Sequence, residues 1–357
     1  MINFGVVGVE HPHAMNMIAG LLEAGARGVG YFTDRPGPLF EQCGKRFPDM
    51  PVMDDPRRLI EDPGVDLIVS ADVPSRRAAV AVAAMRAGKD VLLAKPGCTT
   101  LEQLAEIRRT VAETGRHWVV AFSERVHVRS AVRAGELIQS GAIGRVIQTI
   151  GLGPHRLKPE TRPAWFYDVA SNGHVLTDLA SHQVDQFLYY TGSTSAEIVA
   201  STVGNYTLPG RPAFEDFGEM LLRSPQGHGY VRVDWCTPDG LPTWGDGRLT
   251  ILGTEGYIEL RKYVDIAGRP GTDHCFLVDG AATRRIDCAD VRLPFYPDVI
   301  ADVQGRTETA MPQDHAFTAM ELAIRADLQA VRVGNLRPGT GEAHNGVPPA
   351  AGSSRTS

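Results

Sequence analysis

The chain has 357 residues, 43% of them hydrophobic and 22% charged, and this length favours two domains that fold without disulfide or metal support. A formal net charge of −6 argues against a broad nucleic-acid interface, and five scattered cysteines without a C-x-x-C pair argue against a disulfide framework. Because no apolar stretch could cross a bilayer and Met1–Gly5 lacks a basic leader, we expect a cytoplasmic protein with no membrane or nucleic-acid partner.

The first third of the chain alternates short apolar runs with amphipathic segments. The predicted strands are Asn3–Val9, Val29–Thr33, Val65–Ala71, Val91–Ala94 and Trp118–Phe122. The predicted helices between them are Ala14–Glu23, Pro38–Phe47, Arg76–Ala87 and Leu101–Thr114. The runs are rich in Val, Ile and Leu on both faces, as in strands buried between helices. The alternation predicts an α/β fold with a doubly wound parallel sheet that binds a dinucleotide, over residues 1–122.

The pattern changes after Phe122. The clearest predicted elements are a helix at Ser130–Gln139, a strand at Val146–Gly151, a long helix at Gly173–Tyr190 and a final helix at Gln313–Val333. Between Ala196 and Val278, strands follow one another without helices, which predicts a largely antiparallel sheet. We therefore expect a second α/β domain over 123–334. Residues 335–357 are rich in Gly, Pro, Ser and Ala without periodicity, so we expect a disordered tail.

The turn after the first predicted strand is a degenerate dinucleotide fingerprint. Gly8 occupies the first position of G-x-G-x-x-G, whereas Glu10 and His13 replace the second and third glycines. A side chain at the second position crowds the place where backbone would approach phosphate. Apart from the active-site turn considered below, the candidate cofactor-binding residues are Gly8, Glu10, His11, His13, Asp34, Arg35 and Ala71.

Asp34 closes the second predicted strand. A carboxylate there can accept hydrogen bonds from both adenosine ribose hydroxyls and would repel a 2′-phosphate, which favours NAD over NADP. The adjacent Arg35 could instead stack on adenine or pair with a phosphate, so NADP is the alternative. A solvated Asp-Arg turn is the structural alternative.

Two motifs predict a catalytic site. Lys95 follows a buried strand, at the sheet edge where open α/β folds bind ligands. On a helix, Asp178 and His182 would share a face, with Asp185 one turn further on. A carboxylate one turn from an imidazole can raise the pKa of that imidazole and orient it as a general base.

Two further hypotheses concern a metal site and an aromatic contact. Asp178 and His182 together with His155 or His174 could bind a metal, but no spacing supports one, so we expect no metal. Trp165 could stack on a sugar ring, although an aromatic residue in a loop more often only packs.

Taken in order, these motifs resemble the Gfo/Idh/MocA oxidoreductase family over residues 2–333. The matching stretches are Ala84–Pro96 with A-x-x-A-G-K-x-V-L-x-E-K-P, Val120–Arg125 with V-x-F-x-x-R, Ile138–Gly144 with I-x-x-G-x-I-G, Asp178, His182 and Asp185 with D-x-x-x-H-x-x-D, and Gly253–Gly256 with G-T-x-G. The resemblance implies an N-terminal Rossmann domain and a C-terminal α/β domain with a large, mostly antiparallel open sheet. It also implies a homodimer or homotetramer.

The resemblance implies a sugar, polyol or inositol, or glycoside dehydrogenase that uses NAD or NADP. If this chain works as such enzymes do, His182 would take the hydroxyl proton while hydride leaves for nicotinamide, and Lys95 would hydrogen-bond the same oxygen. Asp178 would bind a neighbouring hydroxyl or orient the site, with Trp165 as a further substrate contact. Lys95, Pro96 and Arg125 would lie near the cofactor.

Three departures from the family pattern leave alternatives open. Ala94 replaces the glutamate of E-K-P, Asp72–Pro74 and Arg77 replace T-P-N and a histidine, and the phosphate turn lacks two glycines. One alternative is a redox-neutral enzyme that cleaves glycosides by transient oxidation with retained NAD. The other is a catalytically silent protein that senses a nucleotide or a sugar.

Overall fold

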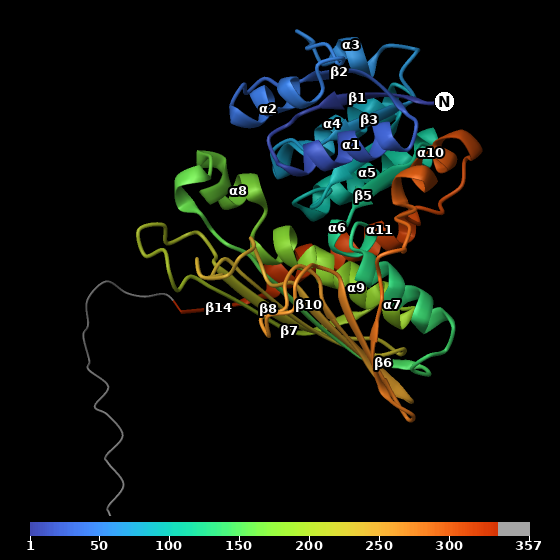
Figure 1. The fold of residues 1–357 in the computed structure, drawn as a ribbon. Helices are drawn as coiled ribbons and strands as arrows, with labels where there is room; N and C mark the ends of the chain where they lie inside the picture. The colour runs from blue at the N-terminus through green and yellow to red at the C-terminus, as the bar shows by residue number, and fades with distance from the viewer. Residues whose placement is uncertain (335–357) are drawn as a thin grey trace, which may run out of the picture.

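The computed structural model describes residues 1–334, and the disorder expected for 335–357 lies outside this range. The chain forms two lobes, each built around its own β-sheet, and Figure 1 shows the N-terminal sheet above the larger C-terminal one. Within the described residues, no helix is both long enough and apolar enough to cross a membrane.

The upper lobe holds a five-stranded parallel sheet in the order β2-β1-β3-β4-β5. Its strands are β1 (Asn3–Val7), β2 (Arg27–Phe32), β3 (Leu67–Ser70), β4 (Asp90–Ala94) and β5 (Trp118–Ala121). This confirms the predicted parallel sheet, with strand ends that differ from the predicted ones by no more than a few residues. The strand order reverses between β1 and β3, and ligands of open α/β sheets bind at the carboxyl ends beside such a switch point.

Helices connect these strands in the predicted order. They are α1 (His13–Glu23), α2 (Pro38–Arg46), α3 (Arg57–Ile60), α4 (Pro74–Arg86) and α5 (Leu101–Thr114). Only the single turn α3 lacks a counterpart in the prediction. The ends of α5 follow from local chemistry, because the Thr100 hydroxyl caps its start and Gly115, with a φ of 63°, ends it in the left-handed conformation.

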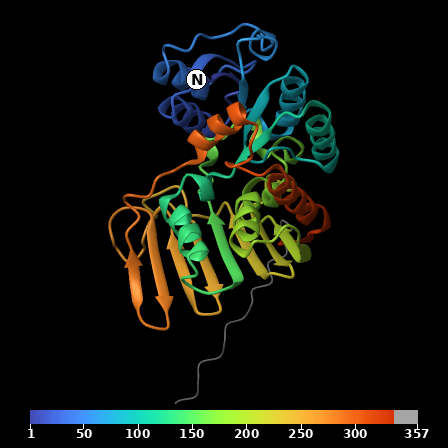
Figure 2. The same cartoon turned by 90° about the vertical axis from the view of Figure 1, so that its right-hand side faces the viewer.

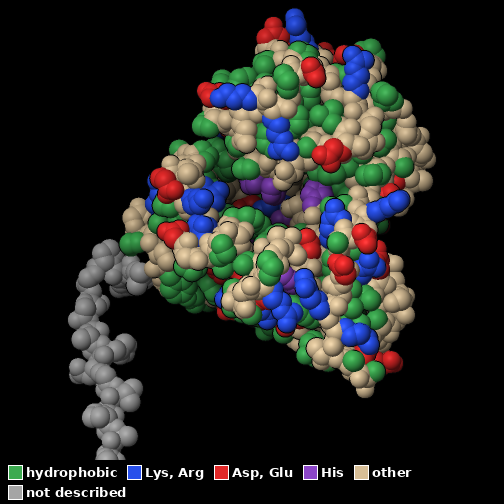
Figure 3. All heavy atoms as spheres, viewed as in Figure 1, with side chains coloured by type: hydrophobic (Ala, Val, Ile, Leu, Met, Phe, Trp, Pro, Cys, Tyr) green, Lys and Arg blue, Asp and Glu red, His purple; other side chains and the backbone are tan. Residues whose placement is uncertain are grey.

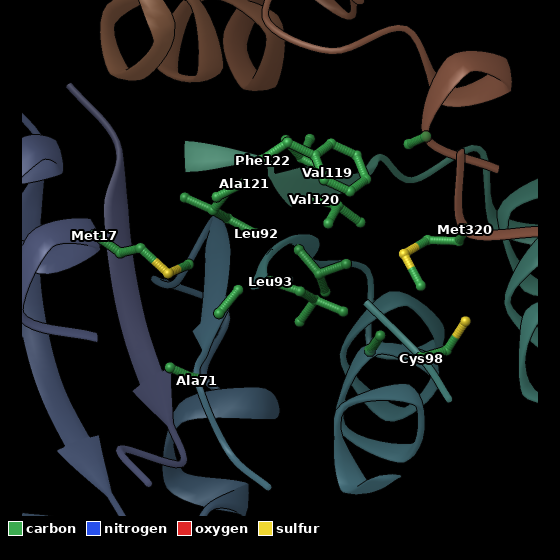
Figure 4. Close-up of a cluster of buried hydrophobic side chains, with 14 of the residues drawn as sticks. Met17, Ala71, Leu92, Leu93, Cys98, Val119, Val120, Ala121, Phe122 and Met320 are labelled. Atoms are coloured by element: carbon green, nitrogen blue, oxygen red, sulfur yellow. The ribbon is translucent and has the colours of Figure 1, made fainter. Parts of the chain in front are cut away.

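One hydrophobic core joins the two lobes. Figure 4 shows Leu92 and Val120 of the upper sheet in one buried cluster with Met320, which belongs to the C-terminal helix α11 (Gln313–Gln329). The rings of Trp118 and Phe317 stack with centroids 4.9 Å apart across the same contact. Because such aromatic side chains each contribute about 1.5–3 kcal/mol when buried, this contact stabilises the packing of the two lobes against each other.

The lower lobe contains a nine-stranded sheet in the order β13-β12-β11-β10-β6-β9-β8-β7-β14. Its strands are β6 (Val146–Pro154), β7 (Glu197–Gly204), β8 (Phe217–Arg223), β9 (His228–Asp234), β10 (Arg248–Gly253), β11 (Gly256–Arg261), β12 (His274–Asp279), β13 (Thr283–Ile286) and β14 (Val331–Val333). Only β6–β9 and β7–β14 are parallel, so the predicted largely antiparallel sheet is confirmed.

Helices cover one face of this sheet, as Figure 2 shows. The helix α7 (Arg129–Gln139) packs on β11 and β12, α9 (Ser181–Thr191) on β6 and β9, and α11 on β7. The remaining short elements are α6 (Ser123–Val126), η1 (Pro159–Thr161), η2 (Ala164–Tyr167) and α10 (Phe295–Gly305). Of these, α10 packs against α1 of the upper lobe.

The predicted continuous helix over Gly173–Tyr190 is wrong in its first part. A short helix α8 (Val169–Asn172) ends at Gly173, and both Gly173 and His174 are left-handed, with φ of 90° and 70°. A π-helical turn, η3 (Leu176–Ala180), then leads into α9. Asp178 thus lies within a π turn, which contains one more residue than an α turn, and not in the regular α-helix that the i, i+4 expectation for Asp178 and His182 assumes.

The predicted final helix over Gln313–Val333 is too long. Helix α11 ends at Gln329, because Val331–Val333 leaves it to pair with β7. Leu328, predicted on the apolar face, is 71% exposed, whereas Phe317, Met320 and Ile324 on that face are buried.

Candidate active site

A hollow lies between the two lobes, and histidine side chains gather inside it (Figure 3). The carboxyl end of β4 and the η3–α9 segment meet here, since Lys95 and Asp178 are in direct contact.

Gly8 and Ala71 tie the first turn across the switch point of the upper sheet. Gly8 has a φ of 88°, and a Cβ atom there would lie 2.4 Å from that of Asp72, so only glycine fits. The carbonyl oxygen of Ala71 accepts from His11 N at 2.9 Å, and Ala71 N donates to Gly8 O at 3.1 Å. A tight turn before α1 at a switch point fits a dinucleotide.

Glu10, which replaces the second glycine, points toward the end of β2. Its carboxylate accepts a hydrogen bond of 2.6 Å from the Thr33 hydroxyl. Burial raises the pKa of this carboxyl group. Arg35 lies beside it and lines a cavity of about 260 Å³ together with Glu10 and Arg162.

The Asp34 carboxylate has a protein partner that the sequence does not predict. Both of its oxygens accept hydrogen bonds from the Arg76 guanidinium of α4, at 3.0 and 2.7 Å. This contact lowers the pKa of Asp34. The carboxylate proposed for ribose recognition is thus already shared with a cation.

Lys95 lies at the end of β4, and its side chain is 3% exposed. Its Nζ donates to both the carbonyl and the Oδ1 atom of Asp178, each at 3.0 Å. The Lys95–Pro96 peptide bond is cis. The site thus joins two residues that the sequence analysis placed in separate motifs.

A buried arginine holds the backbone of this lysine turn. Arg77 is fully buried and donates to the carbonyl oxygens of Ala94, Lys95 and Pro96 at 3.0, 2.6 and 3.0 Å, and to that of Asp72 at 2.8 Å. From the sequence, Arg77 is only a departure from the family pattern. Its role at the sheet edge is evident only from the structure.

His182 is 2% exposed, and its Nδ1 atom has no hydrogen-bond partner within residues 1–334. Burial, followed by the charges of Lys95 and His13, lowers the pKa of His182 well below its ordinary value. The expectation that Asp178 raises this pKa is therefore wrong, because the carboxylate of Asp178 is bonded to Lys95. The imidazole is neutral at physiological pH and can accept a proton.

Asp185 and Arg125 form a buried ion pair. Arg125 donates two bonds of 2.8 Å to Asp185, which His315 Nε2 also contacts at 2.7 Å. The guanidinium lies over the ring of Tyr189, 4.4 Å from its centroid. The pair joins α6, α9 and α11, and this structural role differs from the cofactor contact expected of Arg125.

A second buried charge pair, Lys262 with Glu124, is hydrogen-bonded to Gln183, the residue that follows His182 in the chain. Lys262 Nζ donates to Glu124 Oε2 at 2.7 Å and to Gln186 Oε1 at 2.8 Å, and Gln183 Nε2 donates to Glu124 Oε2 at 3.0 Å. All four side chains are at most 2% exposed. No motif predicts Lys262, although Gln183 follows His182 directly and Glu124 precedes Arg125.

Trp165 and His155 lie in aromatic packing. Trp165 is half-buried in η2 against Phe166, and its Nε1 atom lacks a partner within residues 1–334. The His155 ring packs on Trp235 and Trp244, with burial lowering its pKa to about 4. Within the described part of the chain, no cluster of three His, Cys, Asp or Glu side chains is arranged to hold a metal ion.

Comparisons with known proteins agree with this architecture. Residues 2–122 match the family described as oxidoreductase, NAD-binding Rossmann fold, and residues 131–259 match the GFO/IDH/MocA C-terminal domain. The crystal structure of a candidate oxidoreductase from Erwinia carotovora atroseptica superposes with a TM-score of 0.90 and 46% identity, over 93% of this chain and 100% of the other.

Two curated relatives carry names of specific activities. A scyllo-inositol 2-dehydrogenase (NAD(+)) of Bacillus subtilis is 26% identical, over 63% of this chain and 65% of its own length. A levoglucosan dehydrogenase of Pseudarthrobacter phenanthrenivorans is 29% identical, over 55% of this chain and 51% of its own length. The chain therefore aligns with between about half and two thirds of these relatives.

Proposed function

The chain belongs to the GFO/IDH/MocA oxidoreductase family, and on this basis we propose that it oxidises or reduces a carbinol of a sugar, a polyol such as an inositol, or a glycoside with NAD or NADP. The relatives named above act on an inositol and on levoglucosan, which supports this substrate class. Residues 1–122 would bind the cofactor, and residues 123–334 would provide most of the substrate side.

The contact between Lys95 and Asp178 carries this proposal. It holds an ammonium group at 3.0 Å from a carboxylate in the cleft, and the neutral imidazole of His182 is close enough for its pKa to respond to the lysine charge. An ammonium donor and a neutral base around one position are what reversible oxidation of a hydroxyl requires.

The roles follow from these charge states. A nicotinamide bound beside the pair would supply the hydride chemistry. His182 takes the proton of the reacting hydroxyl, while Lys95 donates a hydrogen bond to the same oxygen and stabilises its negative charge. Asp178 keeps the Lys95 ammonium in place and accepts from a neighbouring substrate hydroxyl. Trp165 would add an apolar contact to the sugar ring.

The proposed cofactor contacts lie in the two turns, just after the second strand β2 and, for Arg125, in α6. Gly8, Glu10, His11, His13, Asp34, Arg35, Ala71, Lys95, Pro96 and Arg125 are the proposed residues. Asp34 favours NAD, whereas Arg76 and Arg35 beside it would offset the charge of a 2′-phosphate. We therefore propose NAD as cofactor, with NADP to be tested in parallel.

We also propose a homodimer or homotetramer that forms through the lower sheet. The strand register places Leu221, Tyr230, Ile150, Leu252 and Tyr257 on one face, opposite the helices. Four of these side chains are 36–44% exposed. An apolar sheet face left uncovered by helices is typical of a surface that binds a second copy.

The decisive experiment is a cofactor-reduction screen. Purified protein is mixed with NAD⁺ or NADP⁺ and a panel of inositols, aldoses, anhydrosugars and glycosides, and absorbance at the reduced nicotinamide band is followed. Net reduction with a free polyol or sugar supports the proposal. Glycoside cleavage without net reduction would indicate the redox-neutral alternative, and absence of cofactor binding would indicate a sensor.

A further inference from the structure

The turn that precedes α1 has few backbone donors left for a phosphate. In dinucleotide folds, backbone N–H groups at this helix N-terminus normally bind the pyrophosphate. Here His11 N already donates to Ala71 O at 2.9 Å, and His13 N donates to the Nδ1 atom of His11 at 3.3 Å. Pro12 between them has no N–H group. Residues 11–13 therefore leave no free backbone N–H group for a phosphate.

Two imidazole rings lie at the same helix end. The rings of His11 and His13 meet edge to face with centroids 4.2 Å apart, and both side chains are half-buried. Because His11 Nδ1 accepts a hydrogen bond, that ring carries its proton on Nε2 and is a donor in its neutral form. The His13 ring has no hydrogen-bond partner within residues 1–334.

We infer that the imidazoles of His11 and His13 bind the cofactor pyrophosphate in place of backbone N–H groups. This inference rests on the proposed function, because it concerns the same nicotinamide dinucleotide. It also accounts for the degenerate fingerprint, in which a histidine occupies the third glycine position. Arg77 lies close enough for its charge to lower the pKa of both imidazoles, and its Nη2 atom has no hydrogen-bond partner among the described residues.

Binding by these rings would be coupled to proton uptake. Burial and neighbouring positive charges hold the pKa of both histidines well below the ordinary value, so both are neutral without ligand. The charged and titratable groups of the surrounding elements are Glu10, Asp34, Arg35, Asp72, Arg76, Arg77, Lys95, His127, His155, Arg162, Asp178 and His182. An arriving diphosphate raises the pKa of the nearest ring by attraction, and that ring takes up a proton.

The sign of the pH dependence follows. A group whose pKa is higher in the complex than in the free protein strengthens binding as the pH falls. Affinity should therefore rise by up to about tenfold for each unit fall in pH between the bound and free pKa values, for one proton. Above the bound pKa this contribution is lost.

The test is calorimetric titration of the full-length protein with NADH, and with NADPH in parallel, at pH 6, 7 and 8. Each titration is made in two phosphate-free buffers with different ionisation enthalpies, so that proton uptake is measured directly. His11→Gln and His13→Gln remove titration while keeping an amide donor, and His228→Gln changes an exposed histidine of β9 as the matched control. Circular dichroism and thermal melting check that each variant is folded.

Wild-type protein and His228→Gln should take up protons and bind more tightly at low pH. His13→Gln should lose the uptake and about 10- to 100-fold in affinity at pH 6, as expected for a charged hydrogen bond. Tight binding that is independent of pH, with both variants near wild type, would overturn this inference and leave the proposed function standing. If neither NADH nor NADPH binds at any pH, both are overturned.

Discussion

The Nζ atom of Lys95 lies 3.0 Å from two oxygen atoms of Asp178, the carboxylate Oδ1 and the main-chain carbonyl, although 83 positions separate the residues in the chain. Asp178 is the middle residue of the π-helical turn η3 that leads into α9. The double contact fixes the ammonium group at the carboxyl edge of the sheet.

Replacing Lys95 with Met should lower kcat by about 10²- to 10⁴-fold, because the reacting oxygen loses its charged donor. NADH affinity, measured by calorimetry, should fall far less than kcat, because Lys95 is only one of the proposed cofactor contacts. Lys45→Met, an exposed position on α2, is the matched control. Near-native turnover of the Lys95 variant would refute the assigned role.

His182 should control the acid limb of the pH profile. Because its pKa is lowered, the neutral base is present throughout the neutral range, and at saturating cofactor kcat/KM for oxidation should be flat from pH 7 to 8 and fall only below pH 6.5. His182→Asn should lose about 10²- to 10⁴-fold and the acid limb with it. A limb centred above pH 7 that persists in the variant would assign the base elsewhere.

The Lys262–Glu124 pair should behave as a buried ion pair. Lys262→Met leaves the Glu124 carboxylate uncompensated inside the protein and should cost about 3–5 kcal/mol of unfolding free energy, measured in denaturant. Adding Glu124→Gln should restore much of this loss. The exposed pair of Arg223 and Glu197 is the comparison, with an expected cost of about 0–1 kcal/mol for Arg223→Met.

His174 should make folding stability depend on pH. The hydrogen bond of 3.1 Å between His174 and Glu215 raises the pKa of His174 in the folded protein. The stabilisation that this bond provides is therefore complete below the pKa of His174 in the unfolded chain. It is lost as the pH rises through the higher pKa of the folded protein. His174→Gln should therefore melt below wild type at pH 5.5, with the gap closing above neutrality. We expect at most roughly 1 kcal/mol, because solvent screens the pair.

The open sheet face should respond to a single charge. Leu221→Lys introduces an ammonium group within the proposed interface, and light scattering after gel filtration should report a smaller assembly. Leu328→Lys, at a more exposed leucine on α11, should leave the mass unchanged. A wild-type protein that is already monomeric would contradict the proposed assembly.

Much of the upper lobe could be predicted because its signals are local. Continuous apolar runs such as Leu67–Ser70 identify buried parallel strands, and Thr100 and Gly115 mark the ends of a helix. The order of motifs also predicts the family. The helix break at Gly173 and His174 and the π turn that follows it could not be predicted. Apolar spacing near 3.6 residues does not reveal one inserted residue.

The partners of the site residues depend on tertiary structure. Asp178 lies near His182 in the chain, yet in the folded protein its carboxylate accepts a hydrogen bond from Lys95. Likewise, Asp34 is bonded to Arg76 of a helix distant in the sequence. Lys262 pairs with a glutamate 138 positions away. Such pairings depend on how sheets and helices meet, so single motifs suggest which groups matter without specifying what each group contacts.

The buried charge of Arg77 should affect the rate at which anionic ligands bind. Burial lowers its pKa to about 10, so it remains charged at neutral pH, and its hydrogen bonds go only to carbonyl oxygens among the described residues. Arg77 thus keeps a buried positive charge behind the lysine turn that salt screens only weakly, with Asp178 and Asp72 as the negative charges that act on it. It should act as an electrostatic funnel that speeds the capture of anionic dinucleotides, so stopped-flow association rates for NADH should fall when Arg77 is neutralised.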